Sequence, residues 1–190
     1  MISANFSLRK SLRHRIFSSI QAENQCAISD VLCYEHPTKY LVSDTDYTDD
    51  WSWIPVLTAN KTFILGYTTE NFGIYDKGPC IILDDFTLDC KYVDFRFKVK
   101  SSAIKILRAK TEIDLRYIFE YIRFLDLNTT EHKRHYIAEI EPMSILLPSN
   151  EDADRIARLF ASLDERLETS RKELKYLESQ KTYMLQKMFI

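Results

Sequence analysis

Residues 149–188 read SNEDADRIARLFASLDERLETSRKELKYLESQKTYMLQKM, without a single glycine or proline. Ser149 follows a proline and lies three positions before Asp152, which is the spacing of a helix cap with an acidic partner in the first turn. Apolar residues then recur alternately four and three positions apart, as in the seam of a coiled coil. The apolar seam residues are Ile156, Phe160, Leu163, Leu167, Leu174, Leu177, Met184 and Met188, with Ser170 and Lys181 as polar interruptions. The segment therefore predicts one long C-terminal helix.

This helix would extend on the order of 60 Å at about 1.5 Å per residue, which is longer than the preceding domain needs for its own cover. The helix carries eight acidic and eight basic residues, of which only Lys181 lies in the seam, so the apolar seam is its adhesive surface. The rest of the sequence predicts no second long helix that would bury this seam. We therefore expect a partner to supply one, and a second copy of the chain would make a homodimer.

The sequence between residues 28 and 110 consists of short apolar runs separated by polar turns, which is typical of a compact sheet. The expected strands are 39–42, 55–57, 62–65, 80–83 and 92–99. A helical stripe over 111–127, capped by Thr111, would cover the sheet. The predicted fold class is α+β: a compact mixed sheet domain with a covering helix, followed by one long C-terminal coiled-coil helix. The expected divisions are 1–27, a basic N-terminal segment, 28–148, the sheet domain, and 149–190, the long dimerisation or spacer helix.

The N-terminal segment has no acid before Glu23 and contains Arg9, Lys10, Arg13 and Arg15. Its apolar residues fall at a four-residue step, so it is interpreted as a short basic surface helix, with a transit peptide as the alternative. The four cysteines lack zinc or redox spacing, and we expect them to be reduced, as in a cytoplasmic protein. No apolar run approaches the roughly 18 residues of a membrane-spanning helix, so no membrane contact is expected.

Most catalytic signatures are missing from the chain of 190 residues, including a glycine-rich phosphate loop, G-x-S-x-G and H-E-x-x-H. Asp84, Asp85 and Asp89 beside Lys91 offer a weak nuclease candidate, against ordinary turn chemistry. His132 and His135 are three positions apart in a cationic loop, which makes a metal site weaker than a solvated loop. We therefore predict no catalytic residue, no metal and no cofactor.

Charge is segregated along the sheet domain. Residues 91–110 hold seven lysine or arginine residues and one acid, whereas residues 41–50 hold four acids and no base. In the alternating run 95–100, Phe95, Phe97 and Val99 would face the core and the intervening cations would face solvent. One positive face on a weakly acidic chain suits the phosphate backbone of double-stranded DNA, although a solvated sheet face would look the same.

The candidate DNA-binding residues divide into two groups. Lysines of the positive strands would contact phosphates, and polar side chains in the turns would reach base edges, although they also suit ordinary turns. The phosphate group is Lys91, Lys98 and Lys100, and the loop group is Lys39, Tyr40, Thr58, Asn60, Lys61, Thr62, Tyr67, Thr68 and Asn71.

Several ordered blocks resemble a known family. In the sheet domain they are YEHPTKY at 34–40, PVLTANKT at 55–62, LGYT at 65–68, DDFT at 84–87 and VDF at 93–95; in the tail they are LPS at 147–149, IA at 156–157, LD at 163–164, QK at 180–181 and LQKMF at 185–189. Together they resemble the target recognition domain and conserved helix of type I restriction-modification specificity subunits.

The resemblance implies sequence-specific DNA recognition without catalysis. A separate methyltransferase subunit would carry the modification chemistry, and a restriction subunit would join through the complex. Members of the family usually have two recognition domains and two long helices, so the chain resembles a half subunit. Two copies paired antiparallel would read a palindromic bipartite site. The competing interpretation is a coiled-coil interaction adaptor that binds protein rather than DNA.

Overall fold

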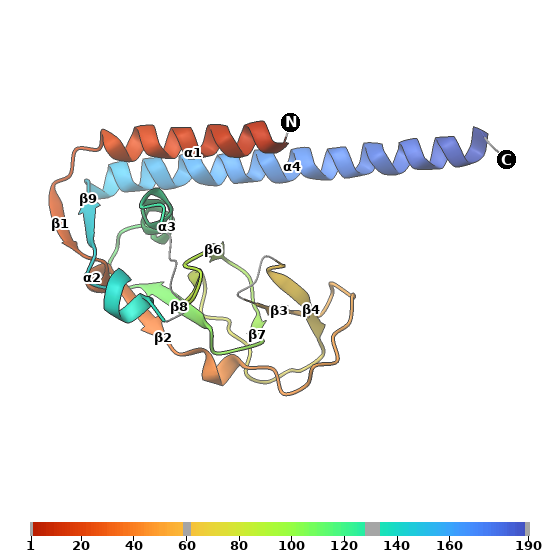
Figure 1. Ribbon diagram of the computed structural model, residues 1–190, viewed down its shortest axis with the longest axis horizontal. Helices are drawn as coiled ribbons and strands as arrows, with labels where there is room; N and C mark the ends of the chain where they lie inside the picture. Colours follow the sequence, from red (N-terminus) through yellow and green to blue (C-terminus); the bar gives the residue numbers. More distant parts are fainter. Residues whose placement is uncertain (1, 59–61, 128–133, 189–190) are drawn as a thin grey trace.

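The computed structural model describes residues 2–58, 62–127 and 134–188. Helix α1 (Ile2–Ser18) lies antiparallel against the first half of α4 (Asn150–Met188). Helix α3 (Leu115–Phe124) lies between this pair and the sheets. The second half of α4 projects beyond the rest of the molecule (Figure 1). The α+β fold class and the long C-terminal helix are thus confirmed.

The domain contains three small sheets. A four-stranded antiparallel sheet has the order β2-β8-β5-β6, a three-stranded sheet has the order β4-β3-β7, with β3 and β7 parallel, and β1 pairs antiparallel with β9. The strands are β1 (Asn24–Ala27), β2 (Leu32–Glu35), β3 (Ile54–Leu57), β4 (Ile64–Thr68), β5 (Cys80–Asp84), β6 (Cys90–Val93), β7 (Lys98–Val99), β8 (Ile104–Ala109) and β9 (Ser144–Leu147). Short helical segments are α2 (Ile28–Val31), η1 (Pro37–Tyr40) and η2 (Tyr136–Ile140).

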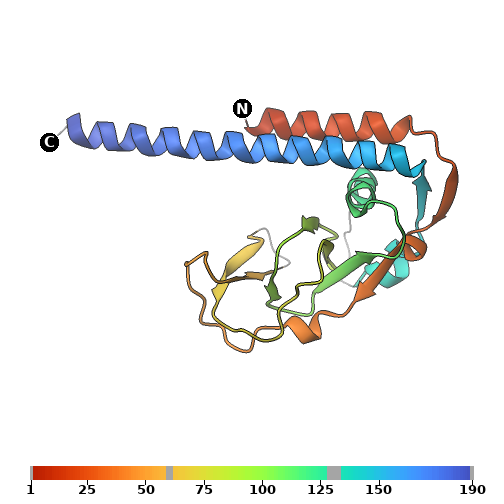
Figure 2. The same cartoon turned by 180° about the vertical axis from the view of Figure 1, so that it is seen from behind.

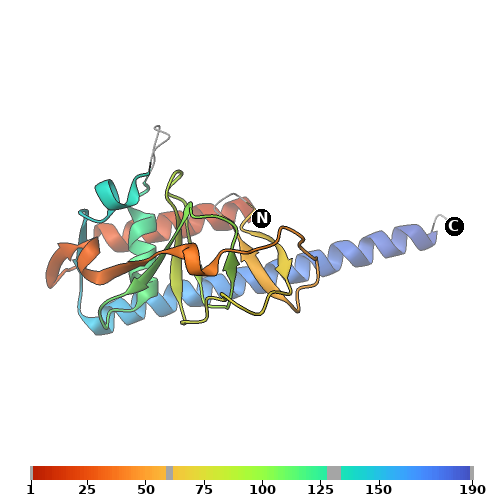
Figure 3. The same cartoon turned by 90° about the horizontal axis from the view of Figure 1, so that it is seen from below.

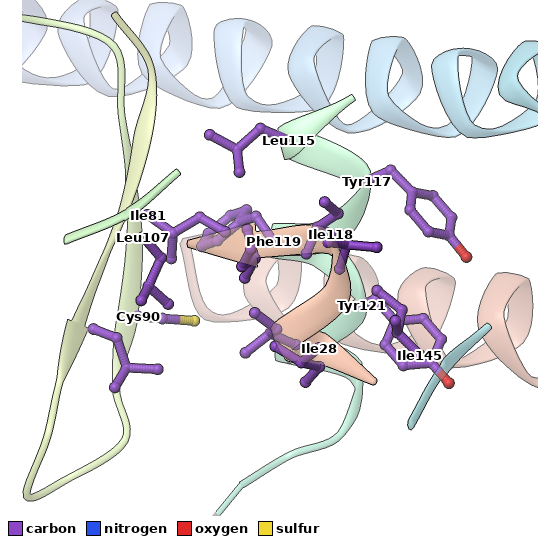
Figure 4. Close-up of a cluster of buried hydrophobic side chains, with 14 of the residues drawn as sticks. Ile28, Ile81, Cys90, Leu107, Leu115, Tyr117, Ile118, Phe119, Tyr121 and Ile145 are labelled. Atoms are coloured by element: carbon purple, nitrogen blue, oxygen red, sulfur yellow. The ribbon is translucent and has the colours of Figure 1, made fainter. Parts of the chain in front are cut away.

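The four-stranded sheet is buried on both faces. On β5, Ile81 and Leu83 face the cluster beneath α3, whereas Cys80 and Ile82 face a second cluster shared with the three-stranded sheet. Figure 4 shows the side chains of α3 meeting those of the sheet in the first cluster. Because both faces of the sheet are apolar, β5 is a continuous apolar run rather than an alternating one.

Part of the seam of α4 is covered by the chain itself, so the expectation that only a partner could cover it is wrong for the first half. Phe160 is fully buried and lies against Phe17 of α1, with ring centroids 6.5 Å apart. Ile156, Leu163 and Leu167 are half-buried. The second half of the seam is exposed at Leu174, Leu177, Met184 and Met188.

The N-terminal segment is helical, as predicted, but it is not a surface appendage. Arg13 and Phe17 are buried, and β1 pairs along its whole length with β9. The expected domain boundary at residue 28 therefore falls between β1, which pairs with β9, and α2, which follows it directly. Within the described residues, no helix is long and apolar enough to cross a membrane.

Several local predictions need correction. The expected strand 39–42 begins as the 3-10 turn η1, because Pro37 fixes its first position. The expected strand 92–99 is divided into β6 and β7, and β2 and β8 were not anticipated. The cap of α3 is Asp114, whose carboxylate accepts from the Arg116 amide at 2.7 Å, rather than Thr111. The Ser149 cap of α4 is confirmed, since its hydroxyl accepts from the Asp152 amide at 3.2 Å.

The four cysteines are free thiols, as expected. Cys80 and Cys90 are buried, and this burial raises the pKa of each thiol to about 12. Both side chains therefore pack as small apolar groups.

Buried charges join the three helices. Glu120 of α3 has a fully buried carboxylate that pairs with Arg9 and accepts from Nε of Arg13 at 2.7 Å. Asp164 of α4 pairs with Arg9 at 2.7 Å and with Arg116 at 2.9 Å. Arg9 and Arg13 of α1 are thus held by acids of α3 and α4.

Replacing Glu120 with glutamine should lower the free energy of unfolding by about 3–5 kcal/mol, because the buried Arg13 guanidinium loses its counter-charge. Urea denaturation followed by circular dichroism measures the change. The control is Lys10→Ala, which breaks the exposed Lys10–Asp126 pair and should cost no more than about 1 kcal/mol. Equal effects from the two substitutions would contradict the role given to burial.

Candidate nucleic-acid interface

Some candidate DNA-binding side chains lie on the surface of the sheet domain. Their elements include η1 and the strands of the three-stranded sheet, and η1 lies on the side of the domain away from α1 and α4 (Figures 1 and 3). The exposed candidates are Lys39, Thr62, Asn71 and Lys100, and the half-buried ones are Tyr67 and Lys91. Asn60 and Lys61 lie outside the described residues.

Four other candidates are buried, so the expectation that they lie on an exposed binding face is wrong. Tyr40 is buried because its ring packs edge-on against Tyr75 in the second cluster, while its hydroxyl donates to Glu35. The hydroxyl of Thr68 accepts a hydrogen bond from the Glu70 amide at 3.2 Å, and this bond fixes the hydroxyl within a turn. The buried candidates are Tyr40, Thr58, Thr68 and Lys98.

Lys98 is the largest departure from the predicted alternation. Phe97, Lys98 and Val99 are all buried, whereas Phe95 is 41% exposed. The reason is that the chain is covered on both faces at β7, which pairs in parallel with β3: Phe97 and Val99 pack in the second cluster, and Lys98 lies beneath Phe72 of the loop after β4. Lys98 therefore anchors the interior instead of contacting phosphate.

The ammonium of Lys98 holds two loops together. It forms an ion pair with Glu70 and donates to the carbonyl oxygen of Phe72 at 2.8 Å. The other carboxylate oxygen of Glu70 accepts from the backbone amides of Ser43 at 2.8 Å and Asp44 at 3.0 Å. One buried ion pair thus joins β7 to the loop after β4 and to the acidic loop that begins at Ser43.

The loop after β4 also approaches η1 closely. Gly73 has φ +57°, and a Cβ atom at this position would lie 2.6 Å from the carbonyl oxygen of Lys39. Only glycine satisfies both the backbone conformation and the available space. This approach brings the loop that carries Asn71 against the turn that carries Lys39.

The positive face is smaller than the sequence predicts, because several of its cations are paired. Lys105 lies 3.2 Å from Asp85, and Lys91 lies 2.9 Å from Asp89. Arg108 lies 3.4 Å from Glu35. Arg96 and Lys100 are exposed. Among the described side chains they have no ion pair, so their charge is available to a ligand.

An aromatic hollow beside these loops was missed in the sequence. It has a volume of about 350 Å³ and is lined by Trp51, Trp53, Tyr67, Phe95 and Arg96, among others. Trp51 is 81% exposed, which is unusual for so large an apolar side chain. The signal was the pairing of both tryptophans of the chain in the run 51–53. Exposed aromatic and arginine side chains together are typical of binding surfaces.

The aspartate cluster has the structure of a turn, as the simpler interpretation predicted. Asp84 accepts from the Phe86 amide at 2.9 Å, and Asp85 accepts from the Tyr136 amide at 2.9 Å. No group of His, Cys, Asp or Glu side chains suited to a metal occurs among the residues that the structure describes. His132 lies outside them, and His135 is buried beside Glu139.

No family model matches the chain, but the proteins to which it is similar are specificity subunits of type I restriction-modification systems. A type I restriction enzyme specificity subunit of Escherichia coli is 38% identical over 173 aligned positions, and the match covers 80% of this chain and 43% of that protein. The chain therefore spans less than half the length of this curated relative.

Two solved structures share the fold. The S subunit of a type I restriction-modification system from M. genitalium aligns with a TM-score of 0.70 and 13% identity, over 93% of this chain and 51% of that one. The HsdS subunit from Thermoanaerobacter tengcongensis aligns with a TM-score of 0.53 and 10% identity, over 88% and 45%.

Replacing Glu70 with glutamine should destabilise the protein by about 3 kcal/mol at pH 7, because Lys98 is fully buried. Burial alone would raise the pKa of Glu70, but Lys98 and the amides of Asp44 and Ser43 outweigh it and hold the pKa below its ordinary value of 4.5. This stabilisation is present above pH 4.5 and is lost as the pH falls further, so the wild type and the variant should converge in acid.

Urea denaturation at pH 7 and at several pH values below 4.5 measures this convergence. The control is Asp46→Asn, at an exposed position of the acidic loop, which should alter neither the stability at pH 7 nor its decline in acid. A constant difference between wild type and Glu70→Gln at every pH would contradict the ion-pair assignment.

Proposed function

Because the chain belongs to the family of type I restriction-modification specificity subunits, we propose that its sheet domain is a target recognition domain for double-stranded DNA. The observation that carries this proposal is the buried Lys98–Glu70 pair, which fixes two loops beside exposed polar and cationic side chains. A rigid scaffold with exposed loops is the arrangement that sequence-specific contacts require.

The contacts divide by chemistry. Lys100 and Arg96 are exposed cations suited to phosphate oxygens, and Lys39 of η1 is a third. Lys91 is a weaker candidate, because it is half-buried and paired with Asp89. Asn71 and Thr62 are exposed polar groups suited to base edges. Lys98 is excluded from this set, since it acts from the interior to hold the loops.

The proposed subunit selects the DNA sequence, and other subunits carry out catalysis. A methyltransferase subunit would carry modification, and a restriction subunit would join through the complex, all in the cytoplasm. The support is the specificity-subunit assignment of the Escherichia coli relative. The exposed tryptophans at 51–53 favour a protein contact as a second role, and together with the exposed half of α4 they fit the adaptor interpretation.

Two copies of the chain would form the bipartite reader through the exposed half of α4. Leu174, Leu177, Met184 and Met188 form an uncovered apolar seam there. An antiparallel homodimer buries both seams and relates the two recognition domains by a two-fold axis, so its target would be palindromic. Light scattering at micromolar concentrations should give twice the mass of 22.5 kDa. A monomer at all concentrations would refute this arrangement.

Replacing Lys100 with alanine should weaken binding to all DNA sequences alike and reduce the slope of log affinity against log salt by about one unit. The measurement is fluorescence anisotropy at several salt concentrations, with the co-purified methyltransferase subunit. Lys172→Ala is the matched control, because Lys172 is an exposed lysine on α4 away from the domain. A result in which both variants bind like the wild type would remove Lys100 from the DNA face.

Replacing Asn71 with alanine should relax sequence preference rather than overall affinity. Loss of a bidentate base contact is expected to reduce discrimination against one altered base pair by about 1–3 kcal/mol. This discrimination is measured with the co-purified complex, by competition between a duplex that carries the site methylated by the complex and duplexes altered at single base pairs of that site. Uniform weakening across all competitors would instead assign Asn71 to backbone contact. An inert complex at low salt would favour the adaptor.

A further inference from the structure

From Leu163 to Met188 the seam of α4 has a spacing that is the same from either end; Leu163 and Leu167 are half-buried beside α1, and the seam positions from Ser170 onward are exposed. Its positions are separated by four, three, four, three, four, three and four residues. The midpoint lies between Leu174 and Leu177. The full set is Leu163, Leu167, Ser170, Leu174, Leu177, Lys181, Met184 and Met188. Two identical helices can therefore be aligned antiparallel with every seam position opposite another seam position.

We propose that two copies of α4 pair in the register that sets Ser170 against Lys181 of the partner subunit. This inference rests on the homodimer proposed above and specifies its alignment. In this register Leu163 faces Met188 of the partner subunit, so apolar residues meet apolar residues. The two polar interruptions meet each other, and a polar layer of this kind is known to select one register.

Other alignments conflict with the structure. A shift one heptad deeper would set Met184 of the partner subunit against Phe160, which is fully buried beneath Phe17 and the arginines of α1. A shift one heptad shallower would set the Lys181 ammonium against the apolar Leu177. A parallel pair would set Lys181 against itself, which repels. The proposed register is the longest overlap that α1 permits.

A hollow between α1 and α4 also provides a binding site for the end of the partner helix. An apolar hollow of about 190 Å³ lies where Leu8 and Leu12 of α1 meet Leu163 and Leu167 of α4. In the proposed register, Met188 of the partner subunit reaches this hollow. Met188 is 76% exposed in the single chain, so the contact would bury an apolar side chain that has no cover of its own. Figure 2 shows the N-terminal end of α1 beside the middle of α4, so α1 limits how far the partner helix can extend along α4.

Charges beside the seam do not decide the alignment. The register sets Arg171 beside Glu178 of the partner subunit, which attracts, but it sets Arg166 beside Lys187 of the partner subunit, which repels. The choice therefore depends on the seam spacing, on the polar layer and on the block formed by α1.

The test is cysteine cross-linking of the full chain. The double variant Ser170→Cys/Lys181→Cys should form a covalent dimer under mild oxidation, with peptide mapping showing a 170–181 link. Each single variant is a matched control and should not cross-link, because like positions lie about 16 Å apart along the helices in this register. Both positions are exposed in the single chain, so the fold should be unaffected. Cross-linking of either single variant at its own new cysteine would overturn the register.

A charge exchange gives an independent readout. Ser170→Lys should raise the dimer dissociation constant at least tenfold, because two ammonium groups then face each other, and Ser170→Lys/Lys181→Glu should restore it. Light scattering on the wild type separates the two proposals. A monomer would refute both the homodimer and its register, whereas a dimer without the 170–181 link or the charge rescue would refute the register alone.

Discussion

A carboxylate without exposed surface, that of Glu120, sets the arrangement of the helices. Its burial is tolerable only because Arg9 and Arg13 of α1 supply opposite charge in the same interior. The aromatic ring of Phe17 completes the contact by packing against α3 and α4. The sheet domain, which packs against α3, consequently has a fixed orientation relative to the long helix. In the proposed dimer, the length of α4 would therefore also set the separation of the two DNA-contacting faces.

The sequence predicts the parts of the fold that depend on local periodicity. The helix from residue 150, its Ser149 cap and the apolar runs at β3 and β5 follow from spacing and flanking residues. The burial of Lys98 could not be predicted in this way. Alternation assumes that one face of the strand is exposed to solvent. Both faces of β7 are instead covered, one by the second apolar cluster and the other by the loop after β4, in a strand that pairs in parallel with the sequence-distant β3.

The same limit applies to the helices and to the candidate site. The basic character of residues 1–22 indicated an exposed segment, because the acids that neutralise Arg9 and Arg13 are on α3 and α4. Likewise, the cations of 91–110 were counted without their partners Asp85, Asp89 and Glu35. Charge pairing across the fold is a tertiary property, so composition overestimates the free positive surface. Family resemblance supplied the functional class that local patterns left open.

The pairing of β1 with β9 brings Asn24 beside Leu147, so the chain enters and leaves the sheet domain at neighbouring points. The sheet domain is therefore connected to α1 and α4 only through these two adjacent strands. A domain from a relative whose two ends lie equally close together would fit between the same helices without changing their length. Under the proposed function, target choice would then depend on the sheet domain and the separation of the half-sites on α4, so that each could be exchanged alone.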